Sequence, residues 1–351
     1  MKAAVLYGKQ DVRIEEVVPR ALQLGEVRIQ IEAALTCGTD LKVYKRGYHA
    51  QMIVPPAVFG HELAGVVSEI GHSKSENETA QTSRLACKIG DRVVVANSAP
   101  CGQCFHCQND QENLCDNLLF LNGAYAESIV IPARIAQKNL LILKGKTAFR
   151  DAALTEPLAC VVQGIQETNI KAGQHVLVIG AGPIGLMFVA LARHLGCEVT
   201  VAGRGEKRLE AAKRFGARQV VEVPSQGNVV SAISATQRFD VVFEAVGKPE
   251  TWEAAVGLVR KGGAVNFFGG CPAGTTVTLD TSLLHYSNLK LLASYHHTPG
   301  TIRRALGFIE GGVIRAADFV DGECPLSALP ELFQSMATGN RAVKTLIRVR
   351  E

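Results

Sequence analysis

The spacing of apolar residues changes in character about halfway along the chain. Up to about Leu154 the apolar runs are short and separated by turn residues, as in Val27 to Ile31, Ala64 to Ser68 and Arg92 to Val95. Such short alternating runs are typical of strands. The polar stretch Gly71 to Lys88 predicts a solvent-exposed loop. This part of the chain is therefore predicted to be β-rich with irregular loops.

Beyond Asp151, short apolar runs alternate with stretches of helical periodicity. The predicted strands are Val176 to Ile179, Glu198 to Ala202, Val241 to Phe243 and Ala264 to Phe268. The predicted helices between them include Leu186 to Leu195 and Lys207 to Phe215. This alternation predicts a parallel sheet with helices on both faces. A last helix, Ile302 to Glu310, and a last strand, Lys344 to Val349, are expected to return to the first domain.

Composition narrows the class of protein. A chain of 351 residues suggests two domains at about 150 residues each. The net charge of +4 is too small an excess to favour a nucleic-acid or membrane-surface protein. The first residues, MKAAVLYGKQ, lack the apolar core of a secretory signal, so we expect a cytoplasmic protein. In that compartment the 10 cysteines are expected to be metal ligands or buried thiols rather than disulfides.

Four of these cysteines form a compact motif in the run CGQCFHCQNDQENLC. Cys101, Cys104, Cys107 and Cys115 have the spacing of ligands that close a tetrahedral shell around one structural zinc ion. The alternative is a set of buried or disulfide-paired cysteines. The run contains no Lys or Arg, which argues against a zinc-ribbon module that binds nucleic acid.

A second set of metal donors is dispersed along the chain. Cys37 lies in CGTD, His61 in GHELAG and Glu156 in TEP. A thiolate, an imidazole and a carboxylate from separate loops suit a catalytic zinc ion with one position left for water or substrate. A single Cys or His is more often packed in a core than bound to a metal, so Cys37 or His61 taken alone would be weak evidence.

A glycine-rich motif follows the apolar run HVLVI and opens a helix. Its glycines allow a tight turn and a close approach of a pyrophosphate to the helix N-terminus. The run GAGPIG therefore predicts a dinucleotide site in which the cofactor contacts are Gly180, Gly182, Pro183, Ile184 and Gly185. Val246, just beyond the strand Val241 to Phe243, is expected at the same site.

The residues after the next strand bear on the choice between NAD and NADP. NAD-specific sites usually place an acidic residue there to bind the ribose, but this chain has Gly203 and Arg204. Gly203 leaves room for a 2′-phosphate, which Arg204 and Arg208 could bind. NADP is therefore favoured. In the alternative interpretation these arginines are solvated and Glu206 binds the ribose.

Together these motifs resemble the zinc-containing medium-chain alcohol dehydrogenase family, in particular its polyol branch of sorbitol and L-iditol dehydrogenases. The resemblance extends over nearly the whole chain. It implies a GroES-like, β-rich zinc-binding domain formed by residues 1–155 and 295–351. It also implies a Rossmann domain, with a doubly wound parallel sheet, formed by residues 156–294. Family members are commonly dimers or tetramers, so a homodimer or homotetramer is expected.

The resemblance also implies roles for single residues around the catalytic zinc. Cys37 and His61 match two ligands, and the third family position falls on Glu156. Glu62 matches either a fourth, exchangeable ligand or a group just outside the ligand set, so which glutamate contacts the metal is left open. Asp40 resembles the acid that orients the ligating histidine.

Two further roles follow from the same resemblance. Thr39 matches the family's hydroxyl proton relay. Lys344 occupies a basic position that is expected to touch the cofactor pyrophosphate.

The expected function is a dehydrogenase that contains two zinc ions and transfers hydride between a secondary alcohol, such as a polyol, cyclitol or sugar-derived alcohol, and NAD(P). The substrate partner is thus a small molecule. One alternative is a threonine- or butanediol-type zinc dehydrogenase, and another is a metal-free quinone or enoyl reductase of the same superfamily. A different class of function, a binding protein on an inactive dehydrogenase scaffold, is disfavoured because each expected catalytic position holds a competent residue.

Overall fold

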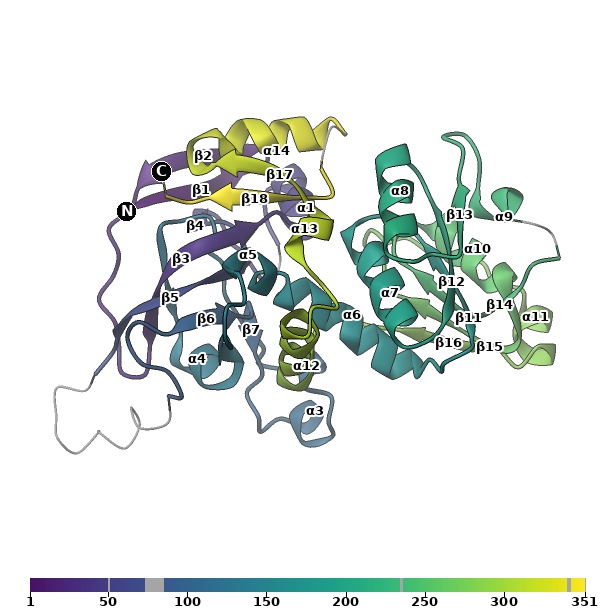
Figure 1. Ribbon diagram of the computed structural model, residues 1–351, viewed down its shortest axis with the longest axis horizontal. Coiled ribbons are helices and arrows are strands. Elements are labelled where there is room, and N and C mark those ends of the chain that lie inside the picture. Colours follow the sequence, from purple (N-terminus) through teal and green to yellow (C-terminus); the bar gives the residue numbers. More distant parts are fainter. Residues whose placement is uncertain (50, 73–84, 234–235, 340–341, 351) are drawn as a thin grey trace. The chain divides into compact units, whose positions relative to one another are not determined.

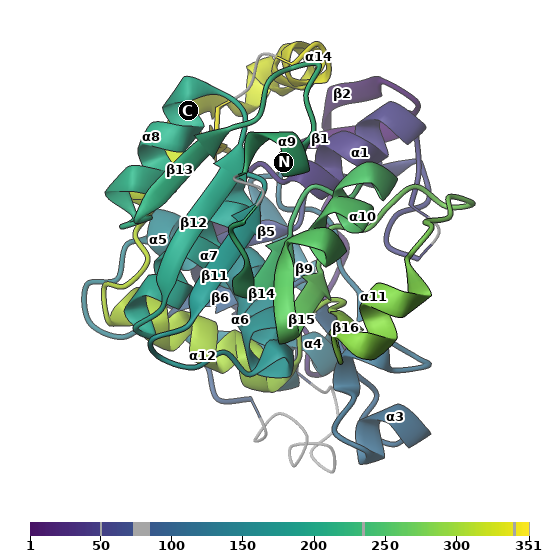
Figure 2. The ribbon, with the colours of Figure 1, turned by 90° about the vertical axis from the view of Figure 1, so that its right-hand side faces the viewer.

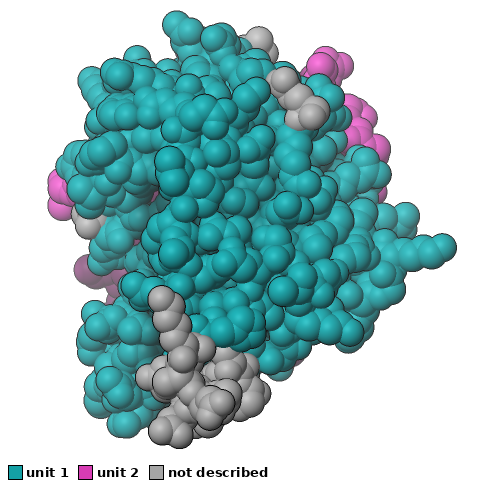
Figure 3. All heavy atoms as spheres, turned by 90° about the vertical axis from the view of Figure 1, so that its left-hand side faces the viewer, with its two compact units in different colours: residues 1–159, 297–351 teal, residues 160–296 magenta. Residues whose placement is uncertain are grey.

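The computed structural model of the protein describes residues 1–49, 51–72, 85–233, 236–339 and 342–350. The chain divides into two compact units (Figure 3). Unit 1 is Met1–Ala159 with His297–Glu351, and unit 2 is Cys160–His296. The boundaries expected from the sequence, 155/156 and 294/295, lie within a few residues of these.

Unit 1 is built on a mostly antiparallel sheet (Figure 1). Its strand order is β10-β6-β5-β3-β18-β17, and β9 also pairs with β3. The bounds are β3 (Val27–Leu35), β5 (Glu62–Ile70), β6 (Arg92–Val95), β9 (Ser128–Ile131), β10 (Leu140–Ile142), β17 (Val320–Pro325) and β18 (Lys344–Arg348). Smaller sheets join β1 (Lys2–Gly8), β2 (Asp11–Glu16) and β4 (Ala57–Val58), and β7 (Ser98–Ala99) with β8 (Leu119–Phe120).

The strand β18 comes from the far end of the sequence and lies between β3 and β17 in the sheet of unit 1. It pairs with β3 in the antiparallel direction, with Leu346 opposite Leu35 and Ile347 opposite Ala34. Because β3 also carries the chain into Cys37, this pairing brings the last segment beside one set of predicted metal donors. The residues that follow unit 2 in sequence are therefore needed to complete unit 1.

Helices surround the sheets of unit 1. They are α1 (Gly38–Arg46), α3 (Phe105–Gln108), α4 (Ala133–Asn139), α5 (Phe149–Ala152), α12 (Pro299–Glu310), α13 (Ala316–Phe319) and α14 (Leu329–Ala337). Two 3₁₀ turns cover Glu112–Leu114 and Leu326–Ala328. The helix α6 (Thr155–Thr168) carries the chain from unit 1 into unit 2. In the core, the ring of Phe333 from α14 packs on Phe59, with the ring centroids 5.3 Å apart.

Unit 2 is a six-stranded parallel sheet in the order β13-β12-β11-β14-β15-β16 (Figure 2). The strand bounds are β11 (His175–Ile179), β12 (Glu198–Gly203), β13 (Gln219–Glu222), β14 (Phe239–Glu244), β15 (Val259–Phe267) and β16 (Lys290–Ala293). The helices are α7 (Pro183–His194), α8 (Glu206–Arg214), α9 (Val229–Ala232), α10 (Pro249–Leu258) and α11 (Thr281–Tyr286). The strand order reverses between β11 and β14, which is the Rossmann arrangement, and ligands bind at this switch point.

Both faces of this sheet are covered by helices. Neighbouring residues of a strand point to opposite faces. On one face Phe243 of β14 stacks on Phe188 of α7, with centroids 4.2 Å apart. On the other, Phe267 of β15 stacks on Trp252 of α10 at the same separation. The predicted fold class, a β-rich GroES-like domain with a doubly wound Rossmann domain, is confirmed.

The predicted elements match the observed ones closely where the pattern is local. Arg92 to Val95 coincides with β6, whereas Val27 to Ile31 covers only the first part of β3, which continues to Leu35. Most of the expected loop Gly71 to Lys88 lies outside the described residues. Within the part of the chain that is described, no helix is long and apolar enough to cross a bilayer.

Candidate active site

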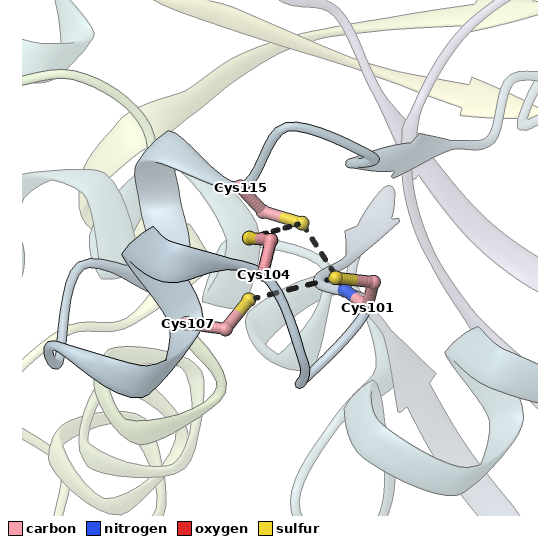
Figure 4. Close-up of side chains that lie close together, drawn as sticks. All are labelled: Cys101, Cys104, Cys107 and Cys115. Atoms are coloured by element: carbon pink, nitrogen blue, oxygen red, sulfur yellow. Dashed lines mark hydrogen bonds between the residues drawn. The ribbon is translucent and has the colours of Figure 1, made fainter.

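The four-cysteine lobe lies between β7 and β8, and its sulfurs face a common centre (Figure 4). All four sulfurs lie within 4.8 Å of one another, and the Sγ atoms of Cys101 and Cys107 are 4.0 Å apart. The Sγ atoms of Cys104 and Cys115 are separated by 3.9 Å. Ligands at about 2.3 Å around a tetrahedral zinc ion are about 3.8 Å apart, whereas a disulfide needs about 2.05 Å. The geometry therefore fits one zinc ion and not two disulfides.

Backbone N–H groups of the lobe point at the sulfurs. Gly102 N donates to Cys107 Sγ at 3.3 Å, and Cys101 N donates to Cys115 Sγ at 3.2 Å. Hydrogen bonds from backbone N–H groups lower the pKa of Cys101 to about 6, while burial raises the pKa of Cys107 to about 12. His106 lies outside the sulfur cluster, with its Nδ1 at 3.2 Å from Gln111 Oε1.

Two of the dispersed donors, Cys37 and His61, come together with Glu62, whereas Glu156 lies outside this group. Cys37 caps the N-terminus of α1, where Thr39 N donates to its Sγ at 3.4 Å. His61 directly precedes β5, and Glu62 is the first residue of that strand. One ligand atom each from Cys37, His61 and Glu62 lies within 4.8 Å of the other two. A soft sulfur, an imidazole and a carboxylate at this separation suit a zinc ion.

The orientation of His61 is fixed by Asp40. The Nδ1 atom of His61 lies 2.8 Å from Asp40 Oδ1, and both side chains are buried. Burial alone would lower the pKa of His61, but the negative charges of Asp40 and Cys37 raise it well above its ordinary value. The Nε2 atom is the one left for a metal, as the expected role of Asp40 requires.

Lys344 has a different partner from the expected one. Its side chain is 2% exposed. The ammonium donates to both carboxylate oxygens of Glu62, with Nζ to Oε1 at 2.7 Å, and to the Thr36 carbonyl at 3.0 Å. These three acceptors use all three N–H donors of a lysine. The expected contact with the cofactor pyrophosphate is therefore not supported. Instead, Lys344 neutralises Glu62 inside unit 1.

Glu156 lies in the first turn of α6 rather than on a loop. Burial raises its pKa to about 7. His297 Nε2 lies 3.8 Å from Glu156 Oε1 and 3.1 Å from Asn97 Oδ1. The sequence offered little to identify His297 as a neighbour of Glu156, because the two are far apart along the chain and the contact arises only in the folded unit.

The glycine-rich loop of unit 2 has the backbone that a dinucleotide site needs. Gly180 has φ of +111°, which favours glycine, and a Cβ on Gly185 would lie 1.8 Å from the Gly180 carbonyl oxygen. Gly182 caps α7, and a Cβ on this residue would meet no atom within 4 Å, so the space in front of the helix N-terminus is open. Pro183 and Ile184 form the first turn of the helix.

A buried carboxylate shapes the loop that contains Val246. Glu244 Oε1, at the end of β14, accepts hydrogen bonds from the N–H groups of Val246 at 2.9 Å and Gly247 at 3.0 Å, and from Thr251 Oγ1 at 2.8 Å. Burial raises the pKa of Glu244, and these donors oppose the shift. Val246 itself is exposed, and its Cγ2 lies near the position that a Cβ on Gly180 would take.

The end of β12 carries the residues expected to select the cofactor. A Cβ on Gly203 would lie 2.7 Å from the Cβ of Ala181, so this glycine is needed for packing beneath the glycine-rich loop. Arg204 is exposed, and its guanidinium donates to the Gly227 carbonyl at 3.0 Å. Arg208 lies half-buried on α8.

Comparison with known proteins identifies the family. Residues 23–141 match the alcohol dehydrogenase GroES-like domain, and residues 183–311 match the zinc-binding dehydrogenase family. Sorbitol dehydrogenase of Bacillus subtilis is 26% identical, over 99% of this chain and 97% of its own length. The 2-dehydro-3-deoxy-L-galactonate 5-dehydrogenase of Pseudoalteromonas atlantica is 28% identical, over 99% and 98%.

Solved structures agree with this result. A zinc-binding dehydrogenase from Sinorhizobium meliloti, bound to NADP in its crystal, is 28% identical with a TM-score of 0.87, and the match covers 99% of this chain and 98% of that one. The order of motifs, the fold of both units and the matched domains all lead to one conclusion: this chain belongs to the zinc-containing medium-chain alcohol dehydrogenase family and is a dehydrogenase.

Proposed function

We propose that the protein oxidises a secondary hydroxyl of a polyol, cyclitol or similar sugar-derived alcohol, or reduces the corresponding ketone, with zinc and NAD(P). The observation that carries the proposal is the group formed by Cys37, His61 and Glu62, whose ligand atoms lie within 4.8 Å of one another. The substrate class is supported by the relatives, which include a sorbitol dehydrogenase and a sugar-acid 5-dehydrogenase.

The catalytic zinc would be held by Cys37, His61 and a carboxylate. Glu62 lies within 4.8 Å of the other two ligand atoms, and Glu156 is the position that the resemblance to the family implies. Glu62 already accepts hydrogen bonds from Lys344 with both oxygens. Glu156 is buried with a raised pKa, so a bound dication would supply the positive charge that keeps its carboxylate ionised. Bound zinc would act as a Lewis acid that lowers the pKa of the substrate hydroxyl, and nicotinamide would accept the hydride.

The chain's own residues orient the donors and move the proton. Asp40 holds the Nδ1 side of His61, so the imidazole presents Nε2. Thr39, in the first turn of α1 beside Cys37, is the proposed hydroxyl that takes up the substrate proton. The four-cysteine lobe would hold a second, structural zinc ion, which gives two per chain. As in the family, we also propose a cytoplasmic homodimer or homotetramer.

The cofactor part of the proposal favours NADP. Arg204 is exposed at the end of β12, no carboxylate occupies the strand end, and a guanidinium has further N–H groups besides the one on Gly227. We expect Arg204→Ala to weaken NADPH binding about ten- to hundredfold, since a hydrogen bond to a charged group contributes about 1.5–3 kcal/mol. NADH binding should change little. Equal losses for both nucleotides in a fluorescence titration would contradict the NADP assignment.

The central test combines zinc counting with turnover on a panel of polyols and sugar acids. Wild-type protein should contain two zinc ions per chain and turn over at least one secondary alcohol. Cys37→Ser should lose one zinc ion and about a thousandfold in kcat, since about 4 kcal/mol of charge stabilisation disappears. Cys324→Ser is the matched control, because Cys324 is a buried thiol in the core of unit 1. Full activity in Cys37→Ser would reject the catalytic site.

A further inference from the structure

A buried tyrosine lies behind the donors of the dispersed site. Tyr125 is 0% exposed, and its hydroxyl oxygen is 2.6 Å from Asp40 Oδ2 and 3.1 Å from the Leu35 carbonyl. Its backbone is held on both sides, since Tyr125 N donates to the Phe59 carbonyl at 2.9 Å and Ala4 N donates to the Tyr125 carbonyl at 2.8 Å. This hydroxyl is neither a proposed zinc ligand nor the proposed proton relay.

The ring of Tyr125 is packed under the turn that leads into His61. Gly60 has φ of +88°, and a Cβ at this position would lie 2.7 Å from the ring of Tyr125. The ring also meets Phe59 edge-on, with the centroids 5.7 Å apart. The residue before His61 must therefore be small for the tyrosine to fit, and the packed ring allows the hydroxyl little freedom to move.

The Tyr125 hydroxyl donates its single hydrogen bond to Asp40. A phenol has one O–H donor, and the shorter contact to a charged acceptor is the stronger one. Burial, together with the negative charge of Asp40, raises the pKa of Tyr125 well above its ordinary value, so the group stays protonated. Asp40 then accepts one hydrogen bond on each oxygen, from Tyr125 on Oδ2 and from His61 on Oδ1.

Tyr125 thus connects the two segments that carry the metal donors Cys37 and His61. Its hydroxyl lies beside the carbonyl of Leu35, two residues before Cys37, and bonds Asp40 on α1, while its ring supports the turn before His61. We propose that Tyr125 is a positioning residue of the catalytic zinc site, whose hydroxyl fixes the Asp40 carboxylate and thereby the direction of His61 Nε2. This inference rests on the proposed zinc chemistry.

The test compares Tyr125→Phe with Tyr44→Phe. Tyr44 is a second buried tyrosine of the same core, with its ring 5.4 Å from that of Phe333. The Asp40 oxygens are bonded to His61 and Tyr125, so the control removes a buried hydroxyl without removing either of these bonds. Zinc transfer to a chromophoric chelator is followed over time in wild type and both variants. In Tyr125→Phe the catalytic zinc should leave about tenfold faster, at the lower end of the effect of groups that hold metal ligands. The lobe zinc should leave at the wild-type rate.

A spectroscopic readout separates positioning from general loosening. With Co²⁺ in the catalytic position, the visible absorption bands report the ligand geometry, so they should shift in Tyr125→Phe and stay unchanged in Tyr44→Phe. Wild-type release rates and an unchanged cobalt spectrum in Tyr125→Phe would overturn the proposal. Equal acceleration of both zinc ions would also overturn it, because that indicates a merely structural role.

A double-mutant cycle with Asp40→Asn gives an independent test. If Tyr125 acts through Asp40, the change Tyr125→Phe should alter zinc release little in the Asp40→Asn protein. Fully additive effects would show that the two residues act separately and would reject the proposal. By contrast, a wild-type protein that binds zinc only in the lobe would refute the proposed function itself, before Tyr125 is considered.

Discussion

The two donor clusters of unit 1 differ in the groups that stabilise the charge of their donors. The four sulfurs of the lobe come from one loop, and backbone N–H groups of that same loop donate to them. The dispersed site draws its donors from segments far apart in sequence and surrounds them with buried charged partners, Asp40 on His61 and Lys344 on Glu62. We infer that metal gives the lobe its shape, whereas the fold gives the dispersed site its shape before metal arrives.

The largest expected effect is the loss of the lobe on removal of one sulfur. Cys104→Ser should abolish zinc binding there and unfold residues 101–115, because structural zinc sites contribute about 10–16 kcal/mol of binding free energy that is coupled to folding. Hydrogen exchange should show lost protection in the lobe and retained protection in the strands β3 and β5. His106→Gln, within the same run, should keep both zinc ions. Retained hydrogen-exchange protection in a lobe that has lost its zinc would contradict the inference that metal gives the lobe its shape.

Next in size is the cost of breaking the buried ion pair. Lys344→Met leaves Glu62 buried without its cation, which should lower the free energy of unfolding by about 3–5 kcal/mol in urea denaturation. Lys144→Met is the matched control, since Lys144 is 87% exposed in its pair with Glu310 and should contribute about 0–1 kcal/mol. The double variant Glu62→Gln with Lys344→Met should recover part of the loss. If Lys344→Met and Lys144→Met lowered the free energy of unfolding equally, the claim that buried charge shapes the site would be wrong.

A pH effect of about 3 kcal/mol is expected from Glu156. Burial raises its pKa from an ordinary 4.5 to about 7. As the pH rises, Glu156 therefore loses its proton in the unfolded chain before it does so in the folded protein. The contribution to stability is therefore complete below about pH 4.5 and is lost as the pH rises through 7. The measurement uses Cys37→Ser, which should keep the lobe zinc, with and without Glu156→Gln. The difference in urea midpoint between the two proteins should change over this pH range, and a constant difference would exclude the effect.

The sequence predicted what depends on local pattern. The cysteine spacing predicted the lobe because its ligands lie within 15 residues, and the apolar run before Gly180 predicted β11. The contact between Lys344 and Glu62 could not be predicted in the same way. These residues are 282 positions apart, and the contact exists only because β18 pairs with β3. The resemblance to the family implies instead that Lys344 contacts the cofactor pyrophosphate.

The role of Tyr125 and the contact of His297 with Glu156 could not be predicted for a related reason. A tyrosine among small apolar residues signals a polar tip that needs a buried partner, but the signal does not name the partner. Asp40 lies 85 positions earlier, and its placement depends on α1 following directly from Cys37. The local pattern therefore predicts candidate donors, whereas the residues that contact them are visible only in the folded chain.

The strand β18 also imposes an order on biosynthesis. A ribosome completes Glu62 long before Lys344, and all of unit 2, Cys160–His296, is translated between them. In the nascent chain, Glu62 therefore has no Lys344 to pair with until unit 2 and the segment after it have been synthesised. Unit 2 is therefore synthesised before the ion pair between Glu62 and Lys344 can form.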